Sequence, residues 1–482
     1  MTNHLATIVE FIFRTAVSIR TYANSRLLFM VLRQRSPVAI RLVAIAVVMM
    51  FVSRRTNGDI ILDDGAQHTI VAAYVDENLL VANQTSVIHQ GSITRATGVP
   101  GSPLPMVSVT GASEFIVDGG EIVYTVGDDT AGVNSILAED GSTVRIDSGE
   151  IFATGLSVTD SHLQVNGGTI AWTYNADAWP YGAVVRNSDF TMTGGSLVGY
   201  MNAIFALGGG MNVYDSTVQV SGGTIEGSAP EGAQSIRLFG QSVLGLSGGE
   251  LRGRGNDAYG VVLSDDSQLF ISGGAITAET YDSRSTGIKM NGNSELNFEG
   301  GHVQVRTIPQ ATLGIALTGI ESLGAAKVTI SDGVIELGSE EAAKLLVLNA
   351  ALVHAKETSA IEVVGGTFEM NGFDSRSRIL FDATGAATIR VSGGDFLVDG
   401  PFLGLHATQQ AEIVVAGSEF NYPMFEAIQD LDGVIAGKLA DGTAIEWSFS
   451  RDATANIILV PEPSSLAGVF ILMLLGRRSL RR

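Results

Sequence analysis

The feature that most constrains the fold is a short sequence motif that recurs along the body of the chain. Two apolar residues alternate with polar ones, a Gly-Gly pair follows, and another apolar residue comes two positions later. With degenerate copies included, the second residue of the pair recurs about every 27 residues from Gly120 to Ser418. A chain with such a period folds as a stack of equivalent units. Clear copies occur at 115–122, 163–170, 218–225, 269–276 and 389–396.

The residues inside each copy predict strands rather than helices. In 163–170 the apolar residues alternate, which is the periodicity of a β-strand. The Gly-Gly pair supplies a sharp corner, because glycine adopts positive φ without a steric penalty. Short strands joined by such corners predict an all-β fold, namely a right-handed single-stranded parallel β-helix of about twelve rungs.

A second position supports the same register. The residue six positions before the first residue of each pair is serine or, less often, alanine. A position that is always small suits a tight corner, where serine hydroxyls bind turn amides. The sequence therefore predicts one column of small side chains along an edge of the solenoid: Ser113, Ser142, Ser161, Ser188, Ser216, Ser242, Ser267, Ser294, Ala326, Ser359, Ala387 and Ala411.

The regions flanking the repeats have a different composition. Within 1–58, arginines precede the apolar stretch 42–52, which has the charge order and length of a secretory signal or anchor. Translation from Met1 or Met30, and cleavage or retention of this segment, all remain open. We expect a capping region and loop at 59–105, β-helix repeats at 106–424, and either a small β cap or one further irregular rung at 425–459.

The C-terminal segment 460–482 combines three features in a fixed order. Pro461 and Pro463 flank Glu462, and two prolines hold the backbone extended and remove amide donors, so we expect this turn to stay outside any sheet. The apolar run 466–475 that follows is shorter than the roughly twenty residues of a membrane-spanning helix. A terminal basic cluster that includes Arg477 and Arg478 would remain on the cytoplasmic side of a membrane.

This layout resembles the PEP-CTERM sorting signal of exported bacterial proteins, although its apolar run is shorter than in longer members of that family. The resemblance implies a C-terminal apolar sorting helix with transient membrane contact, and recognition by an exosortase-type processing enzyme. It also implies export to the cell envelope, the cell surface or the extracellular matrix of a Gram-negative-type bacterium that makes exopolysaccharide. The repeats resemble the pectin-lyase-like and autotransporter-like parallel β-helices.

Composition narrows the classes of partner. The net charge of −21 argues against nucleic acid, whose phosphates are bound by basic patches. Cysteine is absent, so neither disulfides nor Cys-ligated metals are available. An acidic surface attracts cations weakly, which leaves passive Ca²⁺-dependent adhesion as one interpretation without any dedicated cofactor.

The densest aromatic cluster is the candidate carbohydrate contact. It consists of Trp172, Tyr174, Trp179 and Tyr181. Aromatic faces stack on sugar rings, so this cluster would bind a polysaccharide. The alternative is that these residues form a loop packed against the side of the solenoid.

Parallel β-helices include pectin-degrading lyases and hydrolases, so paired carboxylates are also relevant. The pairs 128–129 and 265–266 are both Asp-Asp, but each lies at a predicted turn, where aspartate usually caps local amides. His162 and His302 align with neither pair, and no histidine motif has metal-ligand spacing. The widest spacings between corners fall at 301–366, where the segment 340–346 has helical composition, and there we expect any site-forming insertion.

These observations predict an exported, surface-sorted protein with a structural or adhesive role in the cell envelope or exopolysaccharide matrix and no catalysis of its own. The alternative function is a polysaccharide lyase or glycoside hydrolase built on the same scaffold.

Overall fold

The computed structural model describes residues 60–75, 77–95, 105–124, 135–152, 155–174, 181–201, 207–308, 315–339, 347–372 and 378–462. They belong to the second of two units of the chain, Gly58–Arg482. The described residues form strands and turns, and no helix among them is long and apolar enough to cross a membrane. The expected signal segment, the helical segment at 340–346 and all of the sorting tail beyond Glu462 lie outside the described residues.

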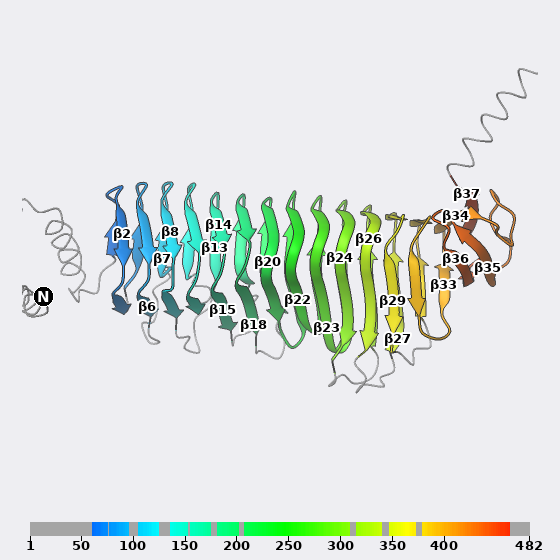
Figure 1. The fold of residues 1–482 in the computed structure, drawn as a ribbon, viewed down its shortest axis with the longest axis horizontal. Coiled ribbons are helices and arrows are strands. Elements are labelled where there is room, and N and C mark those ends of the chain that lie inside the picture. The colour runs from blue at the N-terminus through cyan, green and yellow to red at the C-terminus, as the bar shows by residue number, and fades with distance from the viewer. Residues whose placement is uncertain are drawn as a thin grey trace, which may run out of the picture. The chain divides into compact units, whose positions relative to one another are not determined.

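Each repeat contributes up to three strands, and each strand pairs in parallel with its equivalents one repeat earlier and later. The pairings form three ladders, faces A, B and C, in the order in which the chain visits them, and the rungs follow one another in chain order (Figure 1). Face A comprises β1 (Ile60–Leu62), β4 (Leu79–Val81), β7 (Val107–Val109), β10 (Ile136–Ala138), β13 (Leu156–Thr159), β16 (Tyr181–Arg186), β19 (Leu207–Tyr214), β21 (Gly232–Phe239), the ends of β22 (Val243–Leu263) and β23 (Gln268–Met290), β25 (Ile315–Ser322), β27 (Val347–Ala355), β30 (Arg378–Ala383), β33 (Leu403–Ala407) and the end of β36 (Ala444–Arg451).

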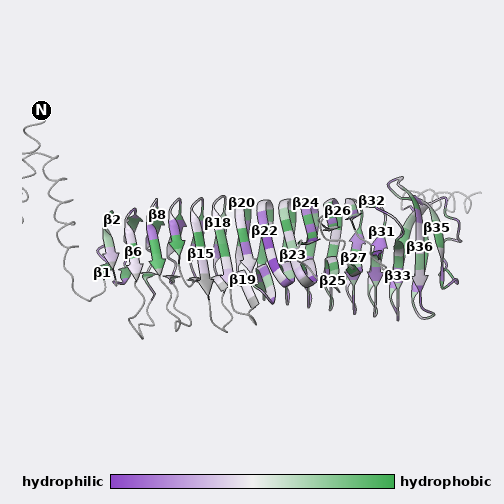
Figure 2. Ribbon diagram, turned by 90° about the horizontal axis from the view of Figure 1, so that it is seen from below, coloured by the Kyte–Doolittle hydropathy of each residue, from purple (hydrophilic) through white to green (hydrophobic). Residues whose placement is uncertain are grey.

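Face B follows a tight turn and carries the apolar alternation that leads into each glycine corner. Hydrophobic and hydrophilic residues alternate along the strands, as Figure 2 shows, because successive side chains point into and out of the solenoid. Face B comprises β2 (Gln67–Ile70), β5 (Ser86–His89), β8 (Glu114–Val117), β11 (Thr143–Ile146), β14 (His162–Val165), β17 (Asp189–Met192), the starts of β20 (Thr217–Ser228), β22, β23, β24 (Glu295–Thr307) and β26 (Lys327–Ser339), and β28 (Ala360–Val363), β31 (Thr388–Val391), β34 (Glu412–Ser418) and β37 (Asn456–Pro461).

Face C follows the glycine corner. In the middle of the ladder the strand pairing continues past the corners, so that β22 and β23 each contribute to all three faces, with register shifts at the corners and positive φ retained at Gly249 and Gly274. The remaining strands of face C are β3 (Ala73–Val75), β6 (Ser92–Arg95), β9 (Glu121–Tyr124), β12 (Glu150–Phe152), β15 (Thr169–Tyr174), β18 (Ser196–Met201), the ends of β20, β24 and β26, β29 (Thr367–Asn371) and β32 (Asp395–Val398).

The two glycines of a corner are required for different reasons. A Cβ at Gly167 would lie 2.4 Å from the carbonyl oxygen of Asp147 in the preceding rung, so the first position must be bare for the rungs to stack. Gly168 has φ +76°, the left-handed region in which glycine alone is unstrained. Both the close approach and the positive φ confirm the predicted corner.

The predicted column of small residues is confirmed. No member is more than 6% exposed, and the chain stacks directly through it. For example, the amide of His162 donates to the carbonyl oxygen of Ser142 across 2.9 Å. Hydroxyls satisfy turn amides as expected: Ser188 Oγ accepts from the amide of Ser161, and Ser216 Oγ accepts from that of Ser188, both across 3.0 Å.

The ladder is longer than the region of clear glycine pairs. The segment 59–105, expected as a capping region and loop, contains β1 to β6. β1, β2 and β3 pair in parallel with β4, β5 and β6, which pair in parallel with β7, β8 and β9. These strands are regular rungs, and their weaker sequence signal reflects corners built without Gly-Gly pairs.

The segment 425–459 is both a cap and a rung. β35 (Asp432–Leu439) and β36 form an antiparallel hairpin, after which the end of β36 rejoins face A beside β33 and β37 rejoins face B beside β34. The expectation that the proline turn stays outside any sheet was wrong for Pro461, which pairs with Gly417 at the end of β37. Proline is compatible with an extended backbone at a strand terminus, where only one donor is lost.

Candidate functional site

Of the four aromatic residues expected to contact sugar, the structure describes the side chain of Trp172. Trp172 is 4% exposed, and a Cβ at either Gly182 or Gly199 would collide with its indole ring. The ring therefore fills the interior beside two glycines, so it has no free face for a sugar, and its assignment as a contact was wrong. Tyr174 ends β15 and Tyr181 begins β16 on either side of Trp179, which lies outside the described residues.

The carboxylate pair at 265–266 lies in a turn, as expected. Asp265 has φ +63°, and its carboxylate accepts from the amide of Gly240 across 3.0 Å. Asp266 accepts from Asn293 Nδ2, also across 3.0 Å. Both groups therefore tie one turn to the next. The second pair, at 128–129, lies outside the described residues, as do Pro463, Arg477 and Arg478 of the sorting motif.

The two singled-out histidines lie on different faces. His162 Nδ1 on face B is 3.3 Å from Asp189 Oδ2, and His302 Nε2 on face C is 3.0 Å from Glu336 Oε2. Each pairs with a carboxylate of the next rung, which is a common cross-strand arrangement. Within the described ranges no group of three or more His, Asp or Glu side chains is placed to hold a metal ion.

Face A instead carries a strip of side chains that alternate with the inward-facing ones and are mostly polar or aromatic, which we call the face A strip. Its central row is fixed by the strand register, and neighbouring members lie one rung, about 4.8 Å, apart. A second row, which includes Arg186, Tyr214, Phe239 and Lys356, lies two residues further along the strands. The central row runs Val184, Asn212, Arg237, Val262, Lys289, Glu321, His354, Asp382 and His406.

The N-terminal part of the face A strip is an aromatic stack flanked by arginines. The rings of Tyr214 and Phe239 are parallel within 4° and their centroids lie 4.7 Å apart. The guanidinium of Arg186 lies 4.7 Å from the Tyr214 centroid, and that of Arg237 lies 4.6 Å from the Phe239 centroid. Each cation–π contact holds a charged group beside an apolar surface.

The middle of the face A strip is an ion cluster around Glu321, which is 6% exposed. Its carboxylate lies 2.6 Å from Lys356 Nζ and 3.8 Å from Lys289 Nζ, and Lys289 in turn lies 5.2 Å from the ring centroid of Tyr259. Burial raises the pKa of Glu321, but the hydrogen bond and charge of Lys356 and the charge of Lys289 outweigh burial and leave the pKa below its usual value.

The C-terminal part of the face A strip places one carboxylate between two histidines. Asp382 lies 3.3 Å from His354 Nε2 and 2.8 Å from His406 Nδ1. The hydrogen bond to Asp382 raises the pKa of His406, whereas burial lowers that of His354. The lowered pKa favours the neutral form of His354, and the raised pKa favours the charged form of His406.

The face A strip differs in charge from the molecule as a whole. Arg186, Arg237, Lys289 and Lys356 lie along it, with Glu321 and Asp382 as the opposing carboxylates of its two rows, on a chain whose net charge is −21. Sequence inspection missed these residues because they lie one repeat apart. If the repeats are aligned on the column of small residues, the residues of the second row fall two or three positions before each serine or alanine of that column.

Face C holds a separate buried ion cluster. Glu279 of β23 is fully buried, with Arg254 Nε of β22 at 2.7 Å and Arg306 Nε of β24 at 2.8 Å. Burial raises the pKa of Glu279, and the hydrogen bonds and charges of the two arginines reverse that shift. The cluster links three rungs, which makes it a stabilising element of the ladder.

The chain matches no protein-family model, and no curated protein is similar to it. Its function is therefore inferred from its own residues.

Proposed function

We propose that this chain is an exported, surface-sorted β-helix protein with a structural or adhesive role in a bacterial cell envelope or exopolysaccharide matrix. The face A strip is the observation that carries this proposal. An acidic polysaccharide is extended and repeating, and the strip offers aromatic edges and cations at a fixed rung spacing along a rigid ladder.

The sorting part of the proposal rests on the resemblance of the C-terminal segment to PEP-CTERM signals. The ladder extends to Pro461, so an exosortase-type enzyme acting at or beyond Pro463 would leave every described rung intact. We further propose that the coil is right-handed, because parallel crossover connections are right-handed in about 98% of cases.

The test is retention of the full-length protein on immobilised polyuronate compared with an immobilised neutral glucan. The double variant R186A/Y214A removes one cation–π unit from the strip. We expect its affinity for polyuronate to fall about tenfold, the equivalent of about 1.4 kcal/mol. The matched control, R390A/F270A, removes an arginine and an aromatic residue from face B, whose side chains are 40% and 41% exposed. Equal losses in the two double variants would refute the assignment of binding to face A.

A polysaccharide lyase or glycoside hydrolase is the second candidate, and His354 is the observation that favours it. This histidine lies between Glu321 and Asp382 in the row, and a neutral histidine beside a carboxylate serves as a general base. The assay follows reducing ends and unsaturated products with the full-length protein, with and without Ca²⁺. Turnover that is abolished by H354Q would establish the enzyme, and no turnover on acidic and neutral substrates would leave the adhesive role.

A further inference from the structure

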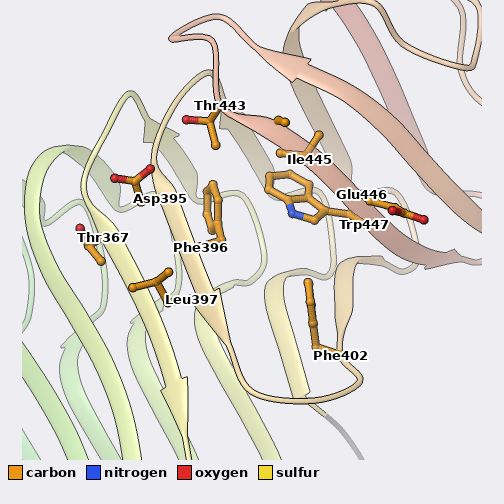
Figure 3. A pocket seen from close by; sticks show the side chains of 10 residues that line it. Thr367, Asp395, Phe396, Leu397, Phe402, Thr443, Ile445, Glu446 and Trp447 are labelled. Atoms are coloured by element: carbon orange, nitrogen blue, oxygen red, sulfur yellow. The ribbon is translucent and has the colours of Figure 1, made fainter.

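A cavity lies where the last described strand of face C, β32, meets the hairpin of β35 and β36 (Figure 3). The turn of this hairpin is fixed over the glycine corner that precedes β32. Asp441 Oδ2 accepts from the amide of Gly394 across 2.7 Å, and the amide of Asp441 donates to the carbonyl oxygen of Ser392 across 3.3 Å. The hairpin therefore bridges the end of face C and leaves an enclosed space beside β32.

This space, which we call the cap cavity, has a volume of about 400 Å³. Small-molecule sites commonly have volumes of roughly 300–1,000 Å³ and form preferentially where two structural units meet. The described lining of the cap cavity comes from β29, β32, the segment after β32 and the start of β36. None of these lining residues belongs to the face A strip, so the cap cavity is a separate site.

Three aromatic side chains line the cap cavity: Phe396, Phe402 and Trp447 (Figure 3). The rings of Phe396 and Trp447 meet edge to face with centroids 4.9 Å apart. Phe396 also stacks on Phe368, with centroids 5.1 Å apart. These contacts hold the Phe396 and Trp447 rings in place before a ligand arrives, so binding costs little side-chain entropy.

The charged residues in the lining of the cap cavity are both acidic. Asp395 and Glu446 are exposed, and Figure 3 shows them on opposite sides of the aromatic rings. Neither carboxylate has an ion-pair partner in the described part of the chain. The lining therefore combines two negative charges with aromatic rings and contributes no cation, which disfavours an anionic ligand.

We propose that the cap cavity binds a small organic cation, an ammonium group carried on a compact body. The electron-rich faces of aromatic rings attract such a cation, and this is the chemistry by which proteins recognise quaternary ammonium groups. The carboxylates of Asp395 and Glu446 add Coulomb attraction. A neutral ligand of the same size would use the rings but would gain nothing from the two charges. This site goes beyond the sorting and adhesive roles and depends on neither.

Isothermal titration calorimetry on the full-length protein tests the proposal. The probes are tetramethylammonium chloride and glucosamine hydrochloride, and tert-butanol and glucose are their uncharged counterparts. Sodium chloride keeps the ionic strength equal in every titration, because salt screens exposed charges. We expect the cations to bind and the uncharged counterparts to bind much more weakly. Tighter binding of tetramethylammonium would identify a quaternary amine as the natural type of ligand, and tighter binding of glucosamine would identify an amino sugar; either supports the proposal.

The double variant D395N/E446Q removes both charges and keeps the shape of both side chains. We expect it to weaken cation binding about tenfold, the equivalent of about 1.4 kcal/mol. The matched control is D399N/E426Q, which removes the same two charges from exposed residues outside the lining and should leave affinity unchanged.

A second readout locates the binding site. Trp447 lines the cap cavity, so a bound cation should change the protein's tryptophan fluorescence, and W447F should abolish that change. Circular dichroism establishes that W447F is folded. Four results would each overturn the proposal: no binding of either cation, equal affinity for the uncharged counterparts, equal losses in the two double variants, or a ligand-induced fluorescence change that persists in W447F.

Discussion

Three glycine-to-alanine substitutions separate the two reasons for glycine at the rung corners. Gly141 has φ +75° with no atom within 4 Å of an added Cβ, so G141A adds only left-handed strain. Gly167 has no positive φ, but its Cβ would lie 2.4 Å from Asp147 O, so G167A adds only the stacking clash. Gly168 has both, with φ +76° and a Cβ 2.7 Å from Gly149 O.

The expected losses in the free energy of unfolding follow from these geometries. Left-handed backbone costs an L-residue roughly 1–2 kcal/mol, which we assign to G141A. Overpacking against fixed backbone costs roughly 1–3 kcal/mol, which we assign to G167A. The variant G168A should therefore lose roughly 2–5 kcal/mol, the sum of the two.

Urea unfolding of each full-length variant, followed by tryptophan fluorescence and circular dichroism, measures these losses. Trp172 is buried in β15, immediately after the 167–168 corner, so its fluorescence reports the affected rung. Because rungs interact chiefly with their neighbours, the local signal should move before the global one in G168A. Equal losses for G141A and G168A would refute the argument that rung stacking demands a bare corner.

Further predictions concern the ion clusters. E279Q should destabilise the protein by about 1.5–3 kcal/mol in urea unfolding, because it removes the charge-assisted hydrogen bonds of a buried carboxylate to two part-exposed arginines. The control E362Q removes an exposed ion pair and should change the free energy of unfolding by less than about 1 kcal/mol. Equal losses of stability in E279Q and E362Q would contradict the stabilising role of the Glu279 cluster. The pKa of His406 is raised on folding, so its contribution is present below the unfolded pKa of about 6.5 and is lost as pH rises; H406Q should therefore destabilise more at pH 6 than at pH 8. The pKa of His354 is lowered, so folding is penalised as pH falls below about 6.5, and H354Q should reduce the acid sensitivity of the urea midpoint.

The sequence was sufficient for those features that depend on local sterics. The glycine corners and the column from Ser113 to Ala411 follow from which side chains fit a tight turn, and a repeat displays that requirement many times. Trp172 was misplaced for the opposite reason. Its burial depends on glycines at 182 and 199, in other strands, which together leave a space that no local pattern reveals.

The face A strip also could not be predicted from the linear sequence. Tyr214 and Phe239 are 25 residues apart, and their stacking depends on the pairing register of β19 with β21. Pro461 shows the limit of a local rule, since proline is unsuited to a strand interior but is tolerated at the last position of β37. Tertiary strand pairing decides whether such a residue joins a strand, and the local preference of the residue sets only the free-energy cost of doing so.

The architecture separates stability from binding. Inward side chains and corners hold the rungs together, so they are mostly apolar residues, glycine, serine and alanine. Outward side chains are released from that restriction, yet their spacing is still fixed by the ladder. A protein of this kind can therefore present a periodic surface without a deep pocket. In this chain, four cations and two stacked aromatic rings lie along the face A strip of a protein whose net charge is −21, and this arrangement supports the proposed binding of an extended, negatively charged polymer.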